Sequence, residues 1–224
     1  MELETLFKGE LSTILMEDGF HFEKDEGGFL AVKNYKLGEK KIFFETSKKT
    51  KNSFSVGISV RVTNHPVEKI HSLVNTKNAS KSFISLRLSQ LTSILNNRDA
   101  DFERKKFNGV LGSMVSIESM NLYKTNLKSC LKVLILPFFN FFNNQESFYN
   151  WLNQPILEDN YNFETAPVWK DAINSLIVSK LVCSEDMNKL YQKWLNQKLP
   201  KGQGFDTREE LIQLKEILNS AYPV

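Results

Sequence analysis

The sequence contains few of the residues from which metal and redox sites are built. Its 224 residues include only two cysteines, Cys130 and Cys183, and three histidines, His21, His65 and His71. None of them stands at a spacing typical of zinc ligands or of a redox motif. We therefore expect no metal site and no cofactor, and unpaired cysteines are typical of a reducing compartment.

A long apolar segment is also missing. The most apolar run, residues 131–142, is interrupted by Lys132, Pro137 and Asn140, whereas a membrane-spanning helix needs about 20 apolar residues. The first ten residues carry three glutamates and lack the basic and continuous apolar regions of a signal peptide. These absences predict a cytoplasmic protein without a membrane partner.

No strong excess of one charge and no catalytic motif is present. Twenty-nine Lys and Arg residues oppose 26 Asp and Glu residues, and the net charge of +3 is too small to predict a polyanionic partner. The sequence has no G-x-S-x-G motif, and Gly109–Gly112 lacks the lysine and hydroxyl residues of a phosphate-binding loop. An enzyme is therefore the less favoured interpretation, although an isolated carboxylate with a raised pKa would leave no motif.

Phenylalanine, by contrast, is abundant. The chain has 17 of these residues, which predicts a bulky aromatic core. The most apolar stretch has Tyr123, Leu127 and Leu131 at four-residue steps, with lysines on the opposite arc, which is typical of an amphipathic helix. Because Pro137 lacks a backbone donor, we expect this helix to stop or kink near Leu136. We also expect it to be a central element against which both halves of the chain pack.

The first half of the chain predicts a helix followed by antiparallel strands. The helix covers about residues 2–17 and ends before Gly19, which suits the left-handed residue after a helix. Strict alternation in Ser53–Thr63 indicates a strand with one buried and one solvated face, and the polar segment Ser47–Asn52 indicates the turn before it. The expected strands are Phe20–Lys24, Phe29–Tyr35, Lys40–Thr46, Ser53–Thr63 and Phe83–Leu88.

Helices dominate the rest of the chain. Asn64 and Pro66 predict the start of a short helix, and residues 96–113 are expected to form a connecting loop. Four more helix starts are expected from capping residues or proline. They are a capping box from Asn143 to Glu146, with Pro155 just beyond that helix, then Pro167, then Ser184, and last a capping box from Asp206 to Glu209.

Together these patterns predict one α+β domain over residues 1–224. Its sheet-containing half is expected at residues 1–95 and its helical half at residues 114–224. The architecture would be an N-terminal helix, an antiparallel β-meander of four to five strands, and about five C-terminal helices packed on one face or end of the sheet.

A basic stretch is the first candidate for binding. Between Lys33 and Lys51 seven lysines oppose two glutamates, on an expected hairpin that also carries Phe43 and Phe44. Such a stretch could lie along nucleic acid phosphates. Lysine on exposed or edge strands also prevents aggregation, which is its commoner use, and the arginines suited to bidentate contacts are absent here. The candidate contact residues are Lys40, Lys41, Lys48, Lys49 and Lys51.

An acidic loop with aromatic residues is the second candidate. Tyr161 and Phe163 lie outside any periodic apolar stripe, next to Glu158 and Asp159. Aromatic side chains dominate the binding energy of many protein interfaces, and they also cover hydrophobic cores. We therefore regard this loop as a candidate surface for a protein partner, with core coverage as the alternative.

Three segments carry a resemblance to a known family. They are EDGF (Glu17–Phe20), SFSVGISVRV (Ser53–Val62) and ILPFFNFFNNQESFYNWL (Ile135–Leu152). Their order resembles an uncharacterised bacterial domain family, some of whose relatives are grouped with immunity proteins of contact-dependent or polymorphic toxin systems. The resemblance implies a non-catalytic protein that binds and blocks a partner, with charge complementarity setting the choice of partner. It assigns no site residue.

The sequence thus favours an intracellular, non-catalytic interaction protein, with an immunity or inhibitor protein as its most specific form. A nucleic-acid-associated protein that uses the stretch Lys33–Lys51 is the first alternative. An enzyme whose site leaves no motif is the second.

Overall fold

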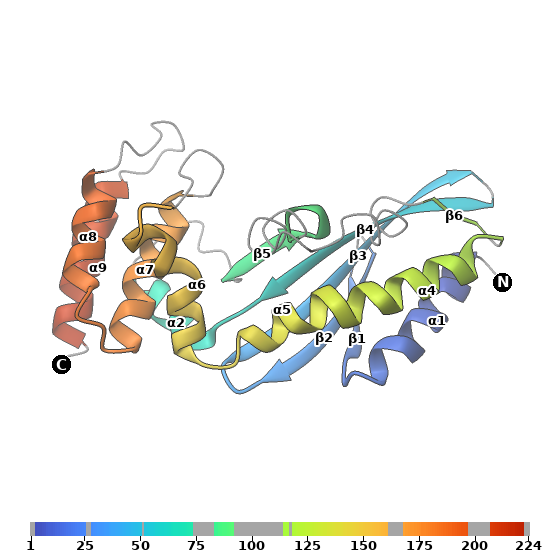
Figure 1. Ribbon diagram of the computed structural model, residues 1–224, viewed down its shortest axis with the longest axis horizontal. Coiled ribbons are helices and arrows are strands. Elements are labelled where there is room, and N and C mark those ends of the chain that lie inside the picture. Colours follow the sequence, from blue (N-terminus) through green and yellow to red (C-terminus); the bar gives the residue numbers. More distant parts are fainter. Residues whose placement is uncertain are drawn as a thin grey trace. The chain divides into compact units, whose positions relative to one another are not determined.

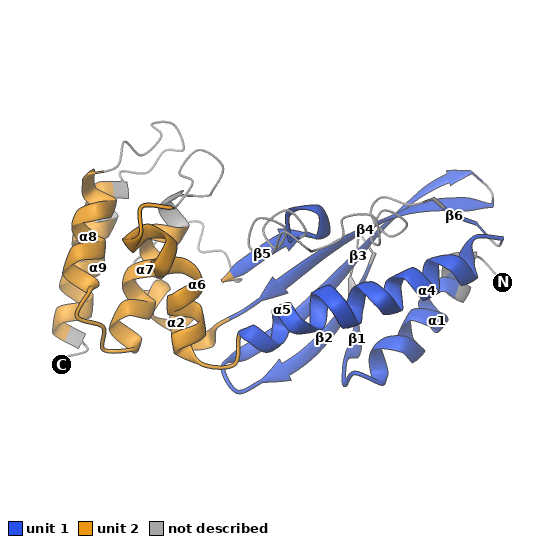
Figure 2. Cartoon of the chain, in the orientation of Figure 1, with its two compact units in different colours: residues 1–63, 84–141 blue, residues 64–83, 142–224 orange. Residues whose placement is uncertain are grey.

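The computed structural model describes residues 3–25, 28–50, 52–73, 83–91, 114–116, 118–160, 168–196 and 207–221. The chain divides into two compact units, of which the first comprises residues 1–63 and 84–141 and the second residues 64–83 and 142–224 (Figure 2). A helix comes first, then an antiparallel sheet, then a series of helices. This order confirms the expected α+β class.

The N-terminal helix α1 (Leu3–Met16) ends as the sequence predicts. Gly19 has a φ angle of +79°, its N–H donates to Met16 O at 3.0 Å, and the N–H of Phe20 donates to Leu15 O at 3.1 Å. These two bonds form a Schellman motif, in which glycine adopts the left-handed conformation without a steric penalty. The motif turns the chain directly into the first strand.

The sheet is a meander with two short additions. Its strands β1 to β4 follow one another in space, and all their pairings are antiparallel. The free side of β4 pairs with β5 along Ser59–Val62 and with β6 along Ser53–Ser55. The bounds are β1 His21–Asp25, β2 Gly28–Tyr35, β3 Gly38–Thr50, β4 Ser53–Val62, β5 Ile84–Arg87 and β6 Met114–Ser116.

Two of these strands differ from the expectation. The sequence predicts a turn over Ser47–Asn52, but β3 continues as a strand to Thr50 and pairs with β4 past an irregularity between Lys48 and Thr50. Strand β6 was not predicted because three residues are too short for a periodic signal. The expected loop at residues 96–113 lies outside the described residues.

One face of the sheet is buried under helices. Opposed residues share a face, so Phe29, Phe44 and Ile58 stand in one row. The ring of Phe7 on α1 lies 5.8 Å from Phe29 and 5.4 Å from Tyr123 on the next long helix. Both helices run along this side of the sheet, which we call the helix-covered face (Figure 1). We call the opposite side the second face.

The long helix does not end at the proline. Helix α4 (Met120–Cys130) continues through a π-helical turn η2 (Leu131–Ile135) into α5 (Leu136–Phe141). The expectation that the helix stops near Leu136 is therefore wrong. Pro137 is exposed, and the preceding turn is widened, so its ring is accommodated where water can reach the backbone.

The second unit is a group of helices around a buried one. Every residue from Ala172 to Ser179 of α7 is buried, which identifies α7 as the core helix of this unit. Asn64 caps α2 through a bond from Val67 N to Asn64 Oδ1 (3.3 Å), as the sequence predicts. The bounds are α2 His65–His71, α6 Gln145–Leu157, α7 Val168–Leu181, α8 Met187–Asn196 and α9 Thr207–Ala221.

Three helix boundaries in this unit differ from the expectation. Helix α8 begins at Met187, so Ser184, the expected cap, lies three residues before it. The cap of α6 is Asn144, whose side chain accepts a bond from Ser147 N at 2.9 Å, so the predicted box from Asn143 to Glu146 is wrong by one residue. The same helix includes Pro155. A proline in the final turn removes only one bond, and the ammonium of Lys193 donates to the terminal carbonyls of Ile156 (3.0 Å) and Leu157 (3.1 Å).

Candidate functional site

The described lysines of the basic stretch do not form one patch. Lys33 donates from Nζ to Asp18 O at 2.7 Å, at the C-terminal end of α1, where a cation is favoured by the helix dipole. Its Nζ also lies 5.8 Å from the centre of the Phe20 ring. Lys36 is exposed in the turn between β2 and β3. Lys33 therefore has a structural partner inside the first unit.

Lys40 is buried. Only 5% of it is exposed, it stands opposite Lys33 in the β2–β3 register, and its Nζ lies 4.6 Å from the centre of the Tyr35 ring. Burial, together with the charge of Lys33, lowers the pKa of Lys40 to about 8. This position makes Lys40 a poor contact for an external anion.

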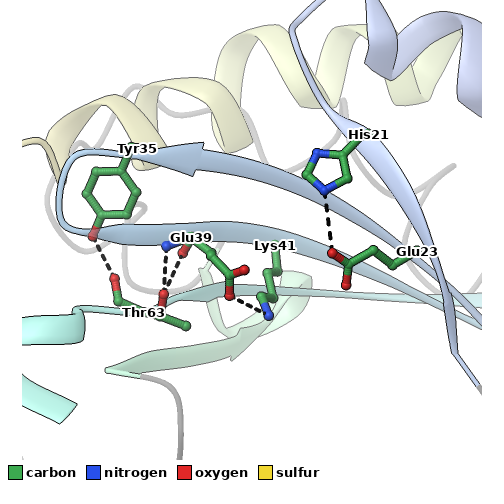
Figure 3. Close-up of polar contacts among 6 residues, drawn as sticks. All are labelled: His21, Glu23, Tyr35, Glu39, Lys41 and Thr63. Carbon is green, nitrogen blue, oxygen red and sulfur yellow. Dashed lines mark hydrogen bonds and ion pairs between the residues drawn. The ribbon is translucent and has the colours of Figure 1, made fainter. Parts of the chain in front are cut away.

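Lys41 lies on the second face and is paired. Its Nζ is 2.7 Å from Glu39 Oε2, and both side chains are drawn in Figure 3. The backbone of Glu39 is fixed by Thr63, whose Oγ1 accepts from Glu39 N at 2.7 Å. Tyr35 Oη donates to Thr63 O at 2.6 Å. These bonds tie the β2–β3 turn to the end of β4.

The remaining candidates lie on an exposed extension that we call the lysine arm, defined as Glu45–Thr50 of β3, the turn residue Asn52, and Ser53–Ser55 of β4. Lys48 and Lys49 are exposed there, and Lys51 lies outside the described residues. The buried side chain of Phe54 anchors the arm against α1. Phe54 is 5% exposed, and its ring centre lies 5.1 Å from that of Phe7. Two lysines are thus presented on an anchored strand.

The edge-strand explanation holds for only part of this set. Lys40 and Lys41 pair with β2 on one side and with β4 on the other, so it is wrong for them. Beyond Glu45, β3 pairs only with β4 among the described residues. Lys48 and Lys49 therefore stand on a local edge, where lysine opposes pairing with other sheets.

The second face carries ionisable side chains from four strands. On β1, His21 Nε2 lies 3.4 Å from Glu23 Oε1, and about half of each side chain is exposed. Both side chains are drawn in Figure 3. Glu39 and Lys41 of β3 follow, and the register adds Arg61 of β4 and Arg87 of β5. The sequence alone does not indicate this group, because only the strand register brings Arg61 and Arg87 to one face.

The acidic candidates lie at the end of α6. Glu158 Oε1 accepts a bond from Gln154 Nε2 at 3.0 Å. Asp159 has a φ angle of +60°, and its Oδ1 is 2.6 Å from Lys193 Nζ. Asp159 thus takes part in closing the helix end. Tyr161 and Phe163 lie outside the described residues.

A second polar cluster, in the helical unit, has a structural role. Tyr149 Oη donates to Asp186 Oδ2 at 2.6 Å, and Ser184 Oγ donates to Tyr149 Oη at 3.1 Å. Burial raises the pKa of Tyr149, and the bond to Asp186 adds to the increase, so the phenol remains a donor. Ser184 accepts from Asp186 N at 3.1 Å, three residues before α8, and so shapes the preceding turn. The cluster ties α6 to that turn.

The free cysteines differ in exposure. Cys130 is fully buried, as expected of a small core residue, and burial raises its thiol pKa to about 12. Cys183 is exposed. Within the described ranges, no three His, Cys, Asp or Glu side chains come together as metal ligands would. None of the helices seen there has the length and apolar composition to cross a bilayer.

Comparison of the chain with protein-family models, with curated proteins and with solved structures finds no match.

Proposed function

We propose that the protein is a non-catalytic binding protein of the immunity or inhibitor kind, which binds and blocks a protein partner. The observation that supports this is the lysine arm. It presents Lys48 and Lys49 on a paired strand anchored by Phe54. A fixed, exposed, charged surface of this kind favours association with an oppositely charged protein and sets its rate and specificity.

The partner is expected to present acidic groups to the arm. In the described part of the arm the positive charges of Lys48 and Lys49 exceed the single negative charge of Glu45. Reversing the two positive charges replaces attraction with repulsion, which weakens binding by at least about tenfold. The anchoring contacts of Phe54 are untouched by such a change, so the fold should be preserved.

The experiment is a pull-down with three tagged proteins at moderate salt, followed by mass spectrometry. They are the wild type, the arm variant Lys48→Glu with Lys49→Glu, and the control Lys128→Glu with Lys132→Glu. The control reverses two exposed lysines on the long helix of the same unit. A stoichiometric protein that the wild type and the control retain, and the arm variant loses, is expected. Purified partner should then lose its activity when mixed with an equimolar amount of this protein.

Two outcomes would contradict the proposal. A partner retained equally by all three proteins would show that the arm is not the contact surface. An equimolar complex that leaves the partner's activity unchanged would rule out the inhibitor role.

Nucleic acid binding is the alternative, and the separation of the lysines bears on it. Lys36 and Lys49 are both exposed but lie at opposite ends of β3, a strand that spans about 40 Å at ~3.3 Å per residue. Few phosphates can then be neutralised at one place. With two contacts, the logarithm of the binding constant should fall with a slope of about −2 against the logarithm of salt concentration. A pull-down that yields only nuclease-sensitive material, whose binding constant falls with salt at this slope or more steeply, would favour nucleic acid.

A further inference from the structure

Two arginines on neighbouring strands stand on the second face of the sheet. Ser59 of β4 is the register partner of Arg87 on β5, and Arg61 is the partner of Ser85. Opposed residues, and alternate residues along one strand, share a face. Arg61 and Arg87 are therefore diagonal neighbours at roughly 7–8 Å, with Ser59 beside both.

Arg61 is held in place by an aromatic ring. The guanidinium carbon lies 4.9 Å from the centre of the Phe43 ring, which belongs to the neighbouring strand β3. This contact orients the planar guanidinium before any ligand arrives. Preorganised donors lose less freedom on binding than mobile ones.

Two polar atoms at this place are shielded from water and lack a hydrogen-bond partner. They are the Nε of Arg61 and the Oγ of Ser59. A shielded donor without an acceptor costs stability, more so when it belongs to a charged group. A buried polar group without a partner needs an explanation, and an ion or water bound at that place is one such explanation.

The carboxylates of the described residues do not neutralise the two arginines. Among the described residues neither arginine forms an ion pair. On the second face, Glu39 is paired with Lys41, and the carboxylate of Glu45 lies over Gly57. A positive potential therefore remains at Arg61 and Arg87.

We infer that Arg61, Arg87 and Ser59 form a binding site for an oxyanion, either a phosphate or a carboxylate group. The guanidinium of arginine presents its N–H donors in a fork that matches two oxygens of such a group. The hydroxyl of Ser59 supplies a further donor. The site is independent of the lysine arm, and the inference does not rest on the proposed function.

The test follows the side-chain Nε–H resonance of Arg61 by nitrogen-15 NMR during titration of the intact protein. Sodium phosphate and sodium acetate represent the two ligand classes, and sodium chloride at matched ionic strength is the reference. A saturable shift with phosphate or acetate, and none with chloride, is expected. The anion that saturates at the lower concentration identifies the class.

Single substitutions test whether the anion binds at these residues. Arg87 is exposed, so Arg87→Gln changes the charge without removing a core contact and should weaken binding by about tenfold or more. Ser59→Ala should weaken it less, because the hydroxyl is uncharged. Lys49→Gln, with the same change of charge on the lysine arm, should leave the affinity within about twofold of the wild type.

Three results would overturn the inference. They are the same shift with chloride as with the oxyanions, no saturable shift with either oxyanion, or wild-type affinity in Arg87→Gln. Thermal unfolding of Arg87→Gln at the wild-type temperature would establish that a loss of affinity reflects the site and not the fold.

Discussion

At the scale of single residues, Lys40 is the clearest conflict between side chain and environment. It lies on the helix-covered face in line with Ile42 and Phe44, and only 5% of it is exposed. An ammonium group at such a position is destabilised by the loss of water and by Lys33 opposite to it. The ring of Tyr35 offsets part of this cost.

Replacing this lysine with an apolar residue should stabilise the protein in a pH-dependent way. The pKa of Lys40 falls from 10.5 to about 8 on folding, so between these values the unfolded chain binds more protons and wild-type stability rises with pH. Below pH 8 the penalty is complete. Lys40→Met should therefore gain about 1–2 kcal/mol at pH 7, and the gain should shrink toward pH 10.

Urea unfolding at pH 7, 9 and 10 measures this difference. Lys41→Met is the control, because Lys41 is the neighbouring lysine but is ion-paired with Glu39 on the second face. Its replacement removes an ion pair and relieves no buried charge, so it should not stabilise the protein at pH 7. A Lys40→Met protein less stable than the wild type at pH 7 would show that the ammonium contributes more through its contacts than it costs through burial.

The position of Lys40 could not be read from its strand alone. Lys40, Ile42 and Phe44 alternate with Lys41, Phe43 and Glu45, and each set carries both apolar and charged residues. Either phase of alternation therefore fits a half-buried strand. The pairing with β4, whose Val60 and Val62 are fully buried, decides the phase.

At the scale of elements, the long helix shows why the stop expected near Pro137 does not occur. Its buried row Tyr123, Leu127, Leu131, Ile135 and Phe139 repeats every four residues. An α-helix has about 3.6 residues per turn, so this row would drift by roughly 40° at each step. A π-helical turn holds more residues and returns the row toward the sheet. The wide turn also accommodates Pro137.

This account predicts the effect of removing the proline. Pro137 is exposed and contributes no core contact to the helix. Pro137→Ala restores a backbone donor and removes the ring, while losing some restriction of the unfolded chain. We expect a net gain of about 1–2 kcal/mol in the free energy of unfolding by urea.

Pro155→Ala provides the comparison. Pro155 lies in the last turn of α6, whose terminal carbonyls accept from Lys193, so its replacement should gain less than that of Pro137. A loss of stability in Pro137→Ala would show that the proline itself maintains the π-helical turn.

The elements themselves were largely predictable, and their pairing was not. Capping and periodicity located α1, α2, β4 and α7 closely, because these signals act over a few residues. The site of Arg61 and Arg87 depends on β5 pairing with β4 across an intervening helix. No local pattern encodes that register. The sequence alone therefore indicates only the basic stretch, whose lysines are close together along the chain.

At the scale of the whole molecule, the two units are not two halves of the sequence. The long helix belongs to the sheet unit, and residues 64–83 belong to the helical unit, so the chain passes between them at residues 63–64, 83–84 and 141–142. The sequence predicts contiguous halves because composition changes along the chain but long-range contacts leave no local trace. All three tryptophans, Trp151, Trp169 and Trp194, fall in the second unit.

Each unit has its own buried residues, so we predict that they lose structure separately. Gly38 supplies a selective perturbation of the first unit, because a Cβ there would lie 2.7 Å from Thr63 O. Gly38→Ala should destabilise that unit by about 1–3 kcal/mol. Hydrogen exchange should accelerate in peptides from β2 to β4, while the tryptophan fluorescence transition of the second unit keeps its midpoint.

Gly9→Ala is the matched control for this experiment. Gly9 lies in α1 of the same unit, with nothing within 4 Å of an added Cβ. The same substitution there should stabilise the unit by about 0.5–1 kcal/mol, through helix propensity. Exchange in the first unit should then slow, again without a change in the fluorescence midpoint. If the midpoint instead moved with both variants, in opposite directions, the two units would be unfolding as one cooperative structure.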